Sequence, residues 1–147
     1  MKILTWEHYV SRVEWLAEKA PTLPFKPDLL IGGARGGCIP AIHLSHKLKL
    51  PVEIIRWSFR DGAVPSHEDI DRLREMVFAK NIVIIEDIVD SGVTLRSIDS
   101  YIMDVVGEVV VFALDHNLEA VQPYDVIAPV IFRRPKDDSW RVYPWEV

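Results

Sequence analysis

The chain has 147 residues and a formal net charge of −5 at pH 7; 49% of the residues are hydrophobic and 27% are charged. These values fit one soluble globular domain spanning residues 1–147 and exclude a disordered or fibrous protein. The acidic balance argues against a nucleic-acid partner, because such binding relies on Lys and Arg side chains that neutralise phosphates.

No apolar run approaches the roughly 20 residues needed to cross a bilayer, and the start MKILTWEHYV lacks the long apolar core of a signal peptide. We therefore expect no stable membrane insertion and a cytoplasmic location. Cys38 is the only cysteine, which excludes an intrachain disulfide and a cysteine-based zinc site.

Apolar periodicity, interrupted by Gly and Pro, divides the chain into alternating helices and strands. The predicted elements, in chain order, are helix 5–19 with Thr5 as N-cap, strand 28–33, helix 37–48, strand 52–58, an exposed loop 59–69, helix 67–77, strand 82–86, helix 94–105, strand 109–114, strand 124–132 and an irregular, aromatic-rich end 135–147. Continuously apolar strands that alternate with helices predict an α/β fold, with a mostly parallel sheet and helices on both faces. Within helix 37–48, His43 and His46 are expected on a solvated face, because no acidic partner lies at matching spacing.

The stretch IVIIEDIVDSGVTL, residues 82–95, combines a buried strand with acids and a turn. Glu86 and Asp87 can accept hydrogen bonds from sugar hydroxyls or hold water on a magnesium ion. An ordinary turn explains the Ser-Gly pair, but two adjacent carboxylates repel each other and gain nothing structural. The turn that follows favours a phosphate through its backbone N–H groups and hydroxyls; its residues are Asp90, Ser91, Gly92, Val93 and Thr94.

A second glycine-rich stretch, IGGARGGCIP, covers residues 31–40. Glycines let the backbone approach an anion closely, and Arg35 offers a forked set of donors that suits phosphate. Taken alone, a glycine-rich strand end with one arginine is more often a tight turn.

Residues 82–94 resemble the phosphoribosyl-diphosphate (PRPP) binding motif of type I phosphoribosyltransferases: four apolar residues, two acids, two apolar residues, then Asp-Ser/Thr-Gly-x-Thr. Nearly the whole chain is similar to the bacterial xanthine-guanine phosphoribosyltransferase subgroup in particular. The shared features are Thr5-Trp6 before the first helix, Arg35-Gly36-Gly37 after a strand, and Trp140 followed by Pro144-Trp145. The resemblance implies the type I phosphoribosyltransferase fold with a small C-terminal hood, and a homo-oligomer, either a dimer or a tetramer.

The same resemblance implies Mg²⁺-dependent transfer of ribose 5-phosphate from PRPP to a nucleobase, expected to be a purine, with release of pyrophosphate. Glu86 and Asp87 would then hold the ribose hydroxyls and the metal's waters. Residues 90–94 would hold the 5′-phosphate, with Asp90 also acting as general base. Arg35, Gly36 and Gly37 would bind pyrophosphate, in a loop that often contains a non-proline cis peptide, here at Ala34-Arg35 or Arg35-Gly36. Loop 59–69 corresponds to the family's mobile lid, although an ordinary surface loop is an equal alternative.

The base-binding residues implied by the resemblance are Leu114, Trp140 and Arg141. Trp140 would stack on the base and the Arg141 backbone would read its edge; a core or interface position is the alternative for Trp140. In 6-oxopurine enzymes a lysine that donates to the purine O6 occupies the position of Leu114. A leucine cannot make that bond, so either another group supplies the donor or the base is not a 6-oxopurine.

Two other functions remain open. A PRPP- or nucleotide-binding regulatory protein would keep the fold without turnover, and Leu114 leaves room for it. A phospho-receiver domain also has an acid pair and a parallel sheet, but it would not follow the acids with a Ser-Gly-x-Thr turn.

Overall fold

The computed structural model describes residues 1–57, 64–133 and 140–147. The helices are α1 (Trp6–Lys19), α2 (Cys38–Leu48), α3 (His67–Val77) and α4 (Val93–Ile102), with 3-10 turns η1 (Ala20–Thr22) and η2 (Pro144–Glu146). The strands are β1 (Lys2–Ile3), β2 (Leu29–Ala34), β3 (Val52–Arg56), β4 (Ile82–Val89), β5 (Val109–Asn117), β6 (Val126–Ile127), β7 (Val130–Phe132) and β8 (Arg141–Val142).

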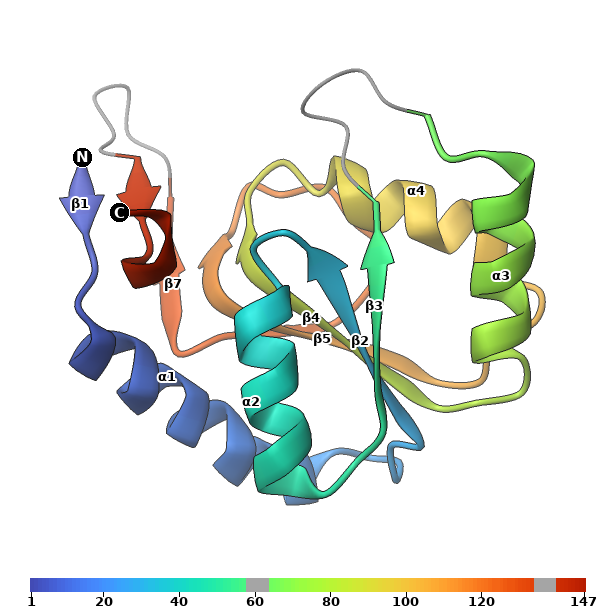
Figure 1. The fold of residues 1–147 in the computed structure, drawn as a ribbon, viewed down its shortest axis with the longest axis horizontal. Helices are drawn as coiled ribbons and strands as arrows, with labels where there is room; N and C mark the ends of the chain where they lie inside the picture. The colour runs from blue at the N-terminus through green and yellow to red at the C-terminus, as the bar shows by residue number, and fades with distance from the viewer. Residues whose placement is uncertain (58–63, 134–139) are drawn as a thin grey trace.

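Six strands form one parallel sheet in the order β3-β2-β4-β5-β6, with β7 also paired to β5. The side chains of its central strands are apolar on both faces of the sheet, because helices cover each face (Figure 1). On β4, Val83 and Ile85 pack on the side of α1 and α2, while Ile82 and Ile84 pack on the side of α3 and α4. The predicted α/β fold with a parallel sheet and helices on both faces is confirmed.

The sequence signals for helix ends agree with the structure. Thr5 caps α1, where its hydroxyl accepts the His8 backbone N–H at 3.2 Å. Ser66 caps α3 by the same arrangement, accepting from the Asp69 N–H at 3.1 Å, and Asp69 accepts the Ser66 N–H in return. These caps satisfy donors that an unprotected helix start would leave without a partner. Each of the described helices is too short or too polar to cross a lipid bilayer.

Strand lengths differ from the prediction at two places that matter for the site. β4 continues to Val89 and β5 to Asn117, beyond the predicted ends at 86 and 114. The parallel ladder runs on through polar positions, pairing Ile88 with Asp115 and Val89 with His116. Backbone hydrogen bonds extend a strand regardless of side-chain polarity, so an apolar run marks only the minimum length of a strand.

The C-terminal third also departs from the prediction. The expected strand 124–132 is interrupted at residues 128–129 into β6 and β7, where Pro129 has no N–H for a ladder. The end expected to be irregular contributes β8, which pairs in parallel with β1. Strands of two residues show no periodicity, so sequence patterns do not reveal them. Residues 59–63 of the predicted lid 59–69 lie outside the described residues.

A buried ion cluster fastens this C-terminal segment to the sheet. Asp115 is 0% exposed, and its carboxylate accepts hydrogen bonds from Arg12 of α1 and from Nε of Arg141 at 2.7 Å. The Tyr143 hydroxyl lies 2.8 Å from Asp115 Oδ2 and 3.0 Å from the Asp87 carbonyl oxygen, and these two acceptors share its single proton. Burial, and after it the charge of Asp115, raises the pKa of Tyr143 far above its ordinary value, so this hydroxyl remains a donor.

We predict that Asp115→Asn lowers the free energy of unfolding by about 3 kcal/mol, because it leaves two buried guanidinium groups without their shared counter-charge. Urea unfolding followed by circular dichroism measures the change. Asp104→Asn is the control, because it breaks an ion pair with Arg74 in which the Asp104 side chain is 63% exposed. It should alter stability much less than Asp115→Asn; equal effects would contradict the role assigned to the cluster.

Candidate functional site

The predicted site residues of the described chain gather where β2, β4 and β5 end. β2 leads into the turn 35–37 and α2, and β4 leads into the turn 90–92 and α4 (Figure 1). Because all three strands are parallel, both turns lie at the same edge of the sheet. This edge is where ligands bind in open parallel sheets.

The glycine-rich stretch 31–40 and the stretch 82–95 contact one another at this edge of the sheet. A Cβ placed on Gly33 would lie 2.7 Å from Glu86 Oε1, and one placed on Gly36 would lie 1.9 Å from Asp87 Oδ2. Gly37 is equally crowded, because its Cβ would lie 2.3 Å from the Ile85 carbonyl oxygen. The glycines of one motif are therefore required by the carboxylates of the other, which makes the two motifs parts of one site.

The acids were predicted at the end of the strand, and they lie inside β4 because the strand continues to Val89. Adjacent residues of a strand point to opposite faces, and Glu86 accordingly lies against Gly33 while Asp87 lies against Gly36. This separation reduces the repulsion expected for neighbouring carboxylates. Asp87 is 9% exposed, and its Oδ1 accepts the backbone N–H of Ile88 at 2.8 Å. One carboxylate oxygen is thus held in place by the strand itself.

The turn at 35–37 has the backbone that the resemblance led us to expect. The peptide bond Ala34-Arg35 is cis. The Gly37 N–H donates to the Gly33 carbonyl at 2.8 Å, which closes the turn before α2 begins. Arg35 is exposed at the tip of this turn, where its guanidinium can reach an anion in solution.

The turn at 90–92 leads directly into α4. Gly92 has φ of 87°, a left-handed conformation, and a Cβ there would lie 2.2 Å from the Val121 carbonyl oxygen, so this position requires glycine. The Val93 N–H donates to the Ser91 hydroxyl at 3.3 Å. Ser91 and Val93 are exposed and Thr94 is half-buried. The start of α4 and the hydroxyls of Ser91 and Thr94 thus lie together at this turn, and a helix N-terminus is a common place for an anion to bind.

The segment after β5 packs beside this turn, a contact that was not predicted from the sequence. The Val121 N–H donates to the Ser91 carbonyl at 3.0 Å, and Arg96 donates to the carbonyls of both Ser91 and Val121. Asn117, 5% exposed, donates from Nδ2 to Asp90 Oδ1 at 3.3 Å. The polar residues that end β5 could have indicated this, because β5 is the neighbour of β4 at the same edge.

The predicted base-binding residues are only partly brought to this edge. Leu114 is 0% exposed and belongs to the core on the α1–α2 side, so its side chain presents no surface to a base; this corrects its assignment. The strand continues beyond Leu114, which the apolar pattern did not indicate. Trp140 is 45% exposed. The Arg141 side chain pairs with Asp115, and its guanidinium carbon lies 3.7 Å from the centre of the Phe132 ring.

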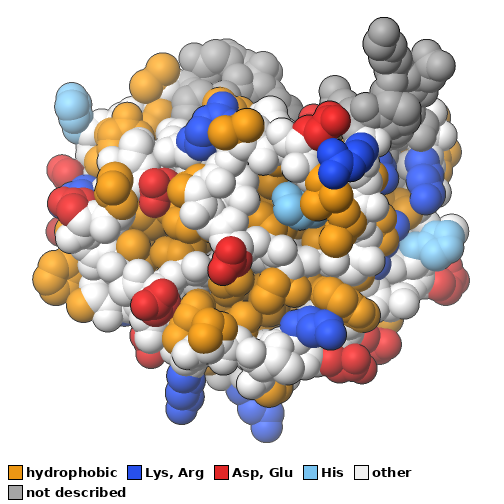
Figure 2. Space-filling model, turned by 180° about the vertical axis from the view of Figure 1, so that it is seen from behind, with side chains coloured by type: hydrophobic (Ala, Val, Ile, Leu, Met, Phe, Trp, Pro, Cys, Tyr) orange, Lys and Arg blue, Asp and Glu red, His pale blue; other side chains and the backbone are white. Residues whose placement is uncertain are grey.

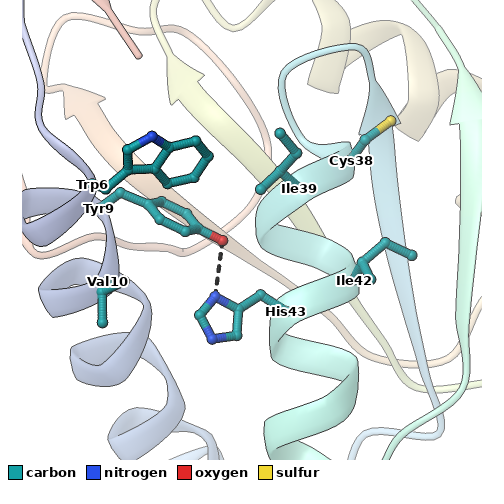
Figure 3. Close-up of a pocket in the computed structure, with 7 residues that line it drawn as sticks. All are labelled: Trp6, Tyr9, Val10, Cys38, Ile39, Ile42 and His43. Carbon is teal, nitrogen blue, oxygen red and sulfur yellow. Dashed lines mark hydrogen bonds between the residues drawn. The ribbon is translucent and has the colours of Figure 1, made fainter. Parts of the chain in front are cut away.

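A separate apolar groove of about 540 Å³ runs between α1 and α2 (Figure 3). Its lining residues are Trp6, Tyr9, Val10, Cys38, Ile39, Ile42 and His43. The Tyr9 hydroxyl and His43 Nδ1 meet at 3.0 Å across the groove, so His43 is half-buried rather than on the solvated face expected from sequence. Burial raises the pKa of Tyr9 to about 12 and lowers the pKa of His43.

The described residues contain no group of three or more His, Cys, Asp or Glu side chains placed to hold a metal ion. Glu86 and Asp87 are the acids at the site. A pair of carboxylates suits an ion that is bound mainly by substrate phosphates and water, as Mg²⁺ commonly is, and does not suit a dedicated protein cage.

Comparison with known proteins agrees with this arrangement. A family model described as the phosphoribosyl transferase domain matches residues 3–137. Orotate phosphoribosyltransferase 2 of Mesorhizobium japonicum is 36% identical over 101 residues, which are 67% of this chain and 48% of that protein. The chain therefore spans about half the length of this curated relative.

Solved structures share the whole fold. The purine phosphoribosyltransferase of Pyrococcus horikoshii is 30% identical, with a TM-score of 0.76 over 99% of this chain and 93% of the other. The xanthine-guanine-hypoxanthine phosphoribosyltransferase of Helicobacter pylori is 18% identical, with a TM-score of 0.72 over 99% and 93% of the two chains; this likeness shows the fold alone. With the family model matching most of its length, the chain belongs to the phosphoribosyl transferase domain family.

Proposed function

We propose that the protein transfers ribose 5-phosphate from PRPP to a ring nitrogen of a nucleobase, forming a nucleoside monophosphate and pyrophosphate. The observation that carries this proposal is the contact between the two motifs, in which Gly33 and Gly36 make room for Glu86 and Asp87. Sites for two anions and for a sugar between them then lie along one sheet edge, as a diphosphate-bearing ribose phosphate requires.

Each part of PRPP has a matching group in this arrangement. Arg35, Gly36 and Gly37 bind the pyrophosphate through the guanidinium and backbone N–H groups. Residues 90–94 bind the 5′-phosphate at the start of α4. Glu86 and Asp87 accept hydrogen bonds from the ribose hydroxyls between these two anion sites. The protein carries a net charge of −5, so local donors rather than overall charge must hold this polyanion.

The carboxylates also fit Mg²⁺ that arrives with PRPP, because they can hold its water molecules from the protein side. When bound, the ion neutralises charge on the departing pyrophosphate. Mg²⁺ is proposed here as part of the substrate complex, since the described residues offer two carboxylates and no larger ligand group at the site.

Asp90 is proposed as the general base. The bond from the ribose C1′ to pyrophosphate oxygen breaks while a bond from C1′ to the base nitrogen forms, and the proton displaced from the base passes to the Asp90 carboxylate. Asp90 lies in the turn that also holds the 5′-phosphate, so the base is expected above the sugar held by that turn. Excluding water from this step would prevent hydrolysis of PRPP.

A purine is the proposed acceptor. It is supported by similarity to the Pyrococcus horikoshii purine enzyme over nearly the whole of both chains, whereas the match to the Mesorhizobium japonicum orotate enzyme covers 67% of this chain. The exposed indole of Trp140 offers a flat face for either kind of base. Because Leu114 is buried, the polar group that reads the base must come from another residue.

A homo-oligomer, dimer or tetramer, is proposed on the basis of exposed apolar surface. Hydrophobic side chains occur in several groups across the middle of the face seen in Figure 2. Exposed apolar residues of the described chain include Leu118, Val121 and Ile131, which are 47%, 68% and 57% exposed. Surface of this kind often marks contacts between proteins.

We predict pyrophosphate release when the protein is supplied with PRPP, Mg²⁺ and a purine, measured in a coupled assay over a panel of purines and orotate. Asp90→Asn should reduce kcat by about a hundredfold, the usual worth of a general base. Chelation of the metal should abolish release and added Mg²⁺ should restore it.

The outcomes of this assay separate the alternatives. Turnover with orotate alone would refute the purine assignment. Binding of PRPP without turnover of any base would support the regulatory protein instead. Release without a base acceptor would indicate hydrolysis rather than transfer.

A second prediction concerns the contact between the motifs. Gly36→Ala should weaken PRPP binding about tenfold, because its methyl group occupies the position of the Asp87 carboxylate, and hydrogen bonds to a charged group contribute roughly 1.5–3 kcal/mol. Calorimetric titration with PRPP and Mg²⁺ measures the affinity. The displaced group is a side-chain end, so folding stability should change little.

Gly107→Ala is the matched control, because its Cβ would meet Asn81 Oδ1 at 2.5 Å and the Lys80 carbonyl at 2.8 Å, away from the site. It should cost stability and leave PRPP affinity unchanged. Wild-type affinity in Gly36→Ala would mean that Asp87 does not contact PRPP.

A further inference from the structure

Asn117 is a buried polar residue to which the reaction proposed above assigns no role. It ends β5, is 5% exposed, and reaches sideways to the turn after β4. There its Nδ2 donates to Asp90 Oδ1 at 3.3 Å. A buried amide at a sheet edge where a base and a phosphate are expected is positioned for more than packing.

Two independent contacts fix the orientation of the Asn117 amide. The backbone N–H of Glu119 can only donate, so the atom 3.0 Å from it must be Oδ1. The opposite side of the amide is then Nδ2, and it faces a carboxylate, which only accepts while ionised. The backbone of Asn117 is held as well, because its carbonyl accepts the Ala120 N–H at 3.0 Å and its strand pairs with β7.

Neighbouring groups hold Asn117 and the turn that carries Asp90 close together. The Val121 N–H and Arg96 guanidinium bind the Ser91 carbonyl, and the crowding of Gly92 against the Val121 carbonyl fixes the two turns at a short distance. The titratable and charged groups around this contact include Arg96 of α4, His116 of β5, and Glu119 from the segment after β5. Burial lowers the pKa of His116, which favours its neutral form.

We infer that Asn117 is a positioning residue, which orients the Asp90 carboxylate for the proton transfer of the proposed reaction. This inference rests on the proposed function of Asp90. The amide donates to one carboxylate oxygen, which restricts the rotation of the Asp90 carboxylate within the turn. Asn117 itself touches neither substrate nor the reacting atoms.

The first test compares steady-state kinetics of Asn117→Leu with the wild type. Leucine has nearly the same shape and cannot donate, so kcat should fall by about tenfold while the KM for PRPP changes less than about threefold. Asn117→Asp places a second carboxylate beside Asp90, and the acidic limb of the pH profile of kcat/KM should move up by about one pH unit or more. A limb that stays in place would show that the side chain at position 117 does not face Asp90.

Asn81→Leu is the matched control. Asn81 also uses Oδ1 to accept a backbone N–H, from Glu108 at 2.9 Å, and it lies just before β4 at the opposite end of the sheet. It should lose thermal stability comparable to Asn117→Leu and keep the wild-type kcat and pH profile. An unchanged kcat in Asn117→Leu, or a change in KM alone, would overturn the inference.

A second measurement needs no turnover and no substitution at Asn117. In ¹H–¹⁵N spectra recorded across pH, the side-chain amide of Asn117 should shift as Asp90 titrates, and the shift should vanish in Asp90→Asn. The Asn81 amide should not follow that titration. Absence of a shift at Asn117 would refute the contact, whereas a shift without turnover of any base would preserve the contact and refute the proposed function.

Discussion

The carboxylate of Asp115 joins parts of the chain that are far apart in sequence. It is fully buried on β5 and is bound by Arg12 of α1, by Arg141 of β8 and by the Tyr143 hydroxyl. The same hydroxyl lies against the Asp87 carbonyl in β4. Breaking such a cluster leaves uncompensated buried charge, so electrostatics hold the C-terminal segment to the six-stranded sheet, while its strand β8 pairs with β1 in a separate two-stranded sheet.

A second constraint is the space between β2 and β4. Glu86 and Asp87 occupy positions that any side chain at Gly33 or Gly36 would fill. The two acids leave the strand on opposite faces, so each meets a different part of the glycine-rich turn. Close backbone approach, separated carboxylates and a helix N-terminus then follow from one packing arrangement.

Sequence patterns predicted the fold class, the four helices and the strands of the central sheet, because apolar periodicity and caps such as Thr5 are local signals. They did not predict the pairing of β1 with β8 or the ion cluster at Asp115, since both depend on which distant residues meet. The candidate site was predicted only in part, because some of its residues also come together through contacts between distant parts of the chain. The motif around Asp90 is contiguous and recognisable, whereas Asn117 joins the site only through the neighbouring strand. Leu114 was assigned to the base because it occupies the position of the lysine in the resembling family, and alignment alone does not reveal that its side chain is buried in the core.

The central claim is that residues 35–37 and residues 90–94 form one binding site for PRPP. Backbone ¹H–¹⁵N chemical shifts recorded while PRPP and Mg²⁺ are added test it most directly. Resonances from both segments should shift together and reach saturation at the same PRPP concentration, while those of the groove residues on α1, which are Trp6, Tyr9 and Val10, stay unchanged. Shifts confined to one segment, or different saturation for the two, would contradict the claim.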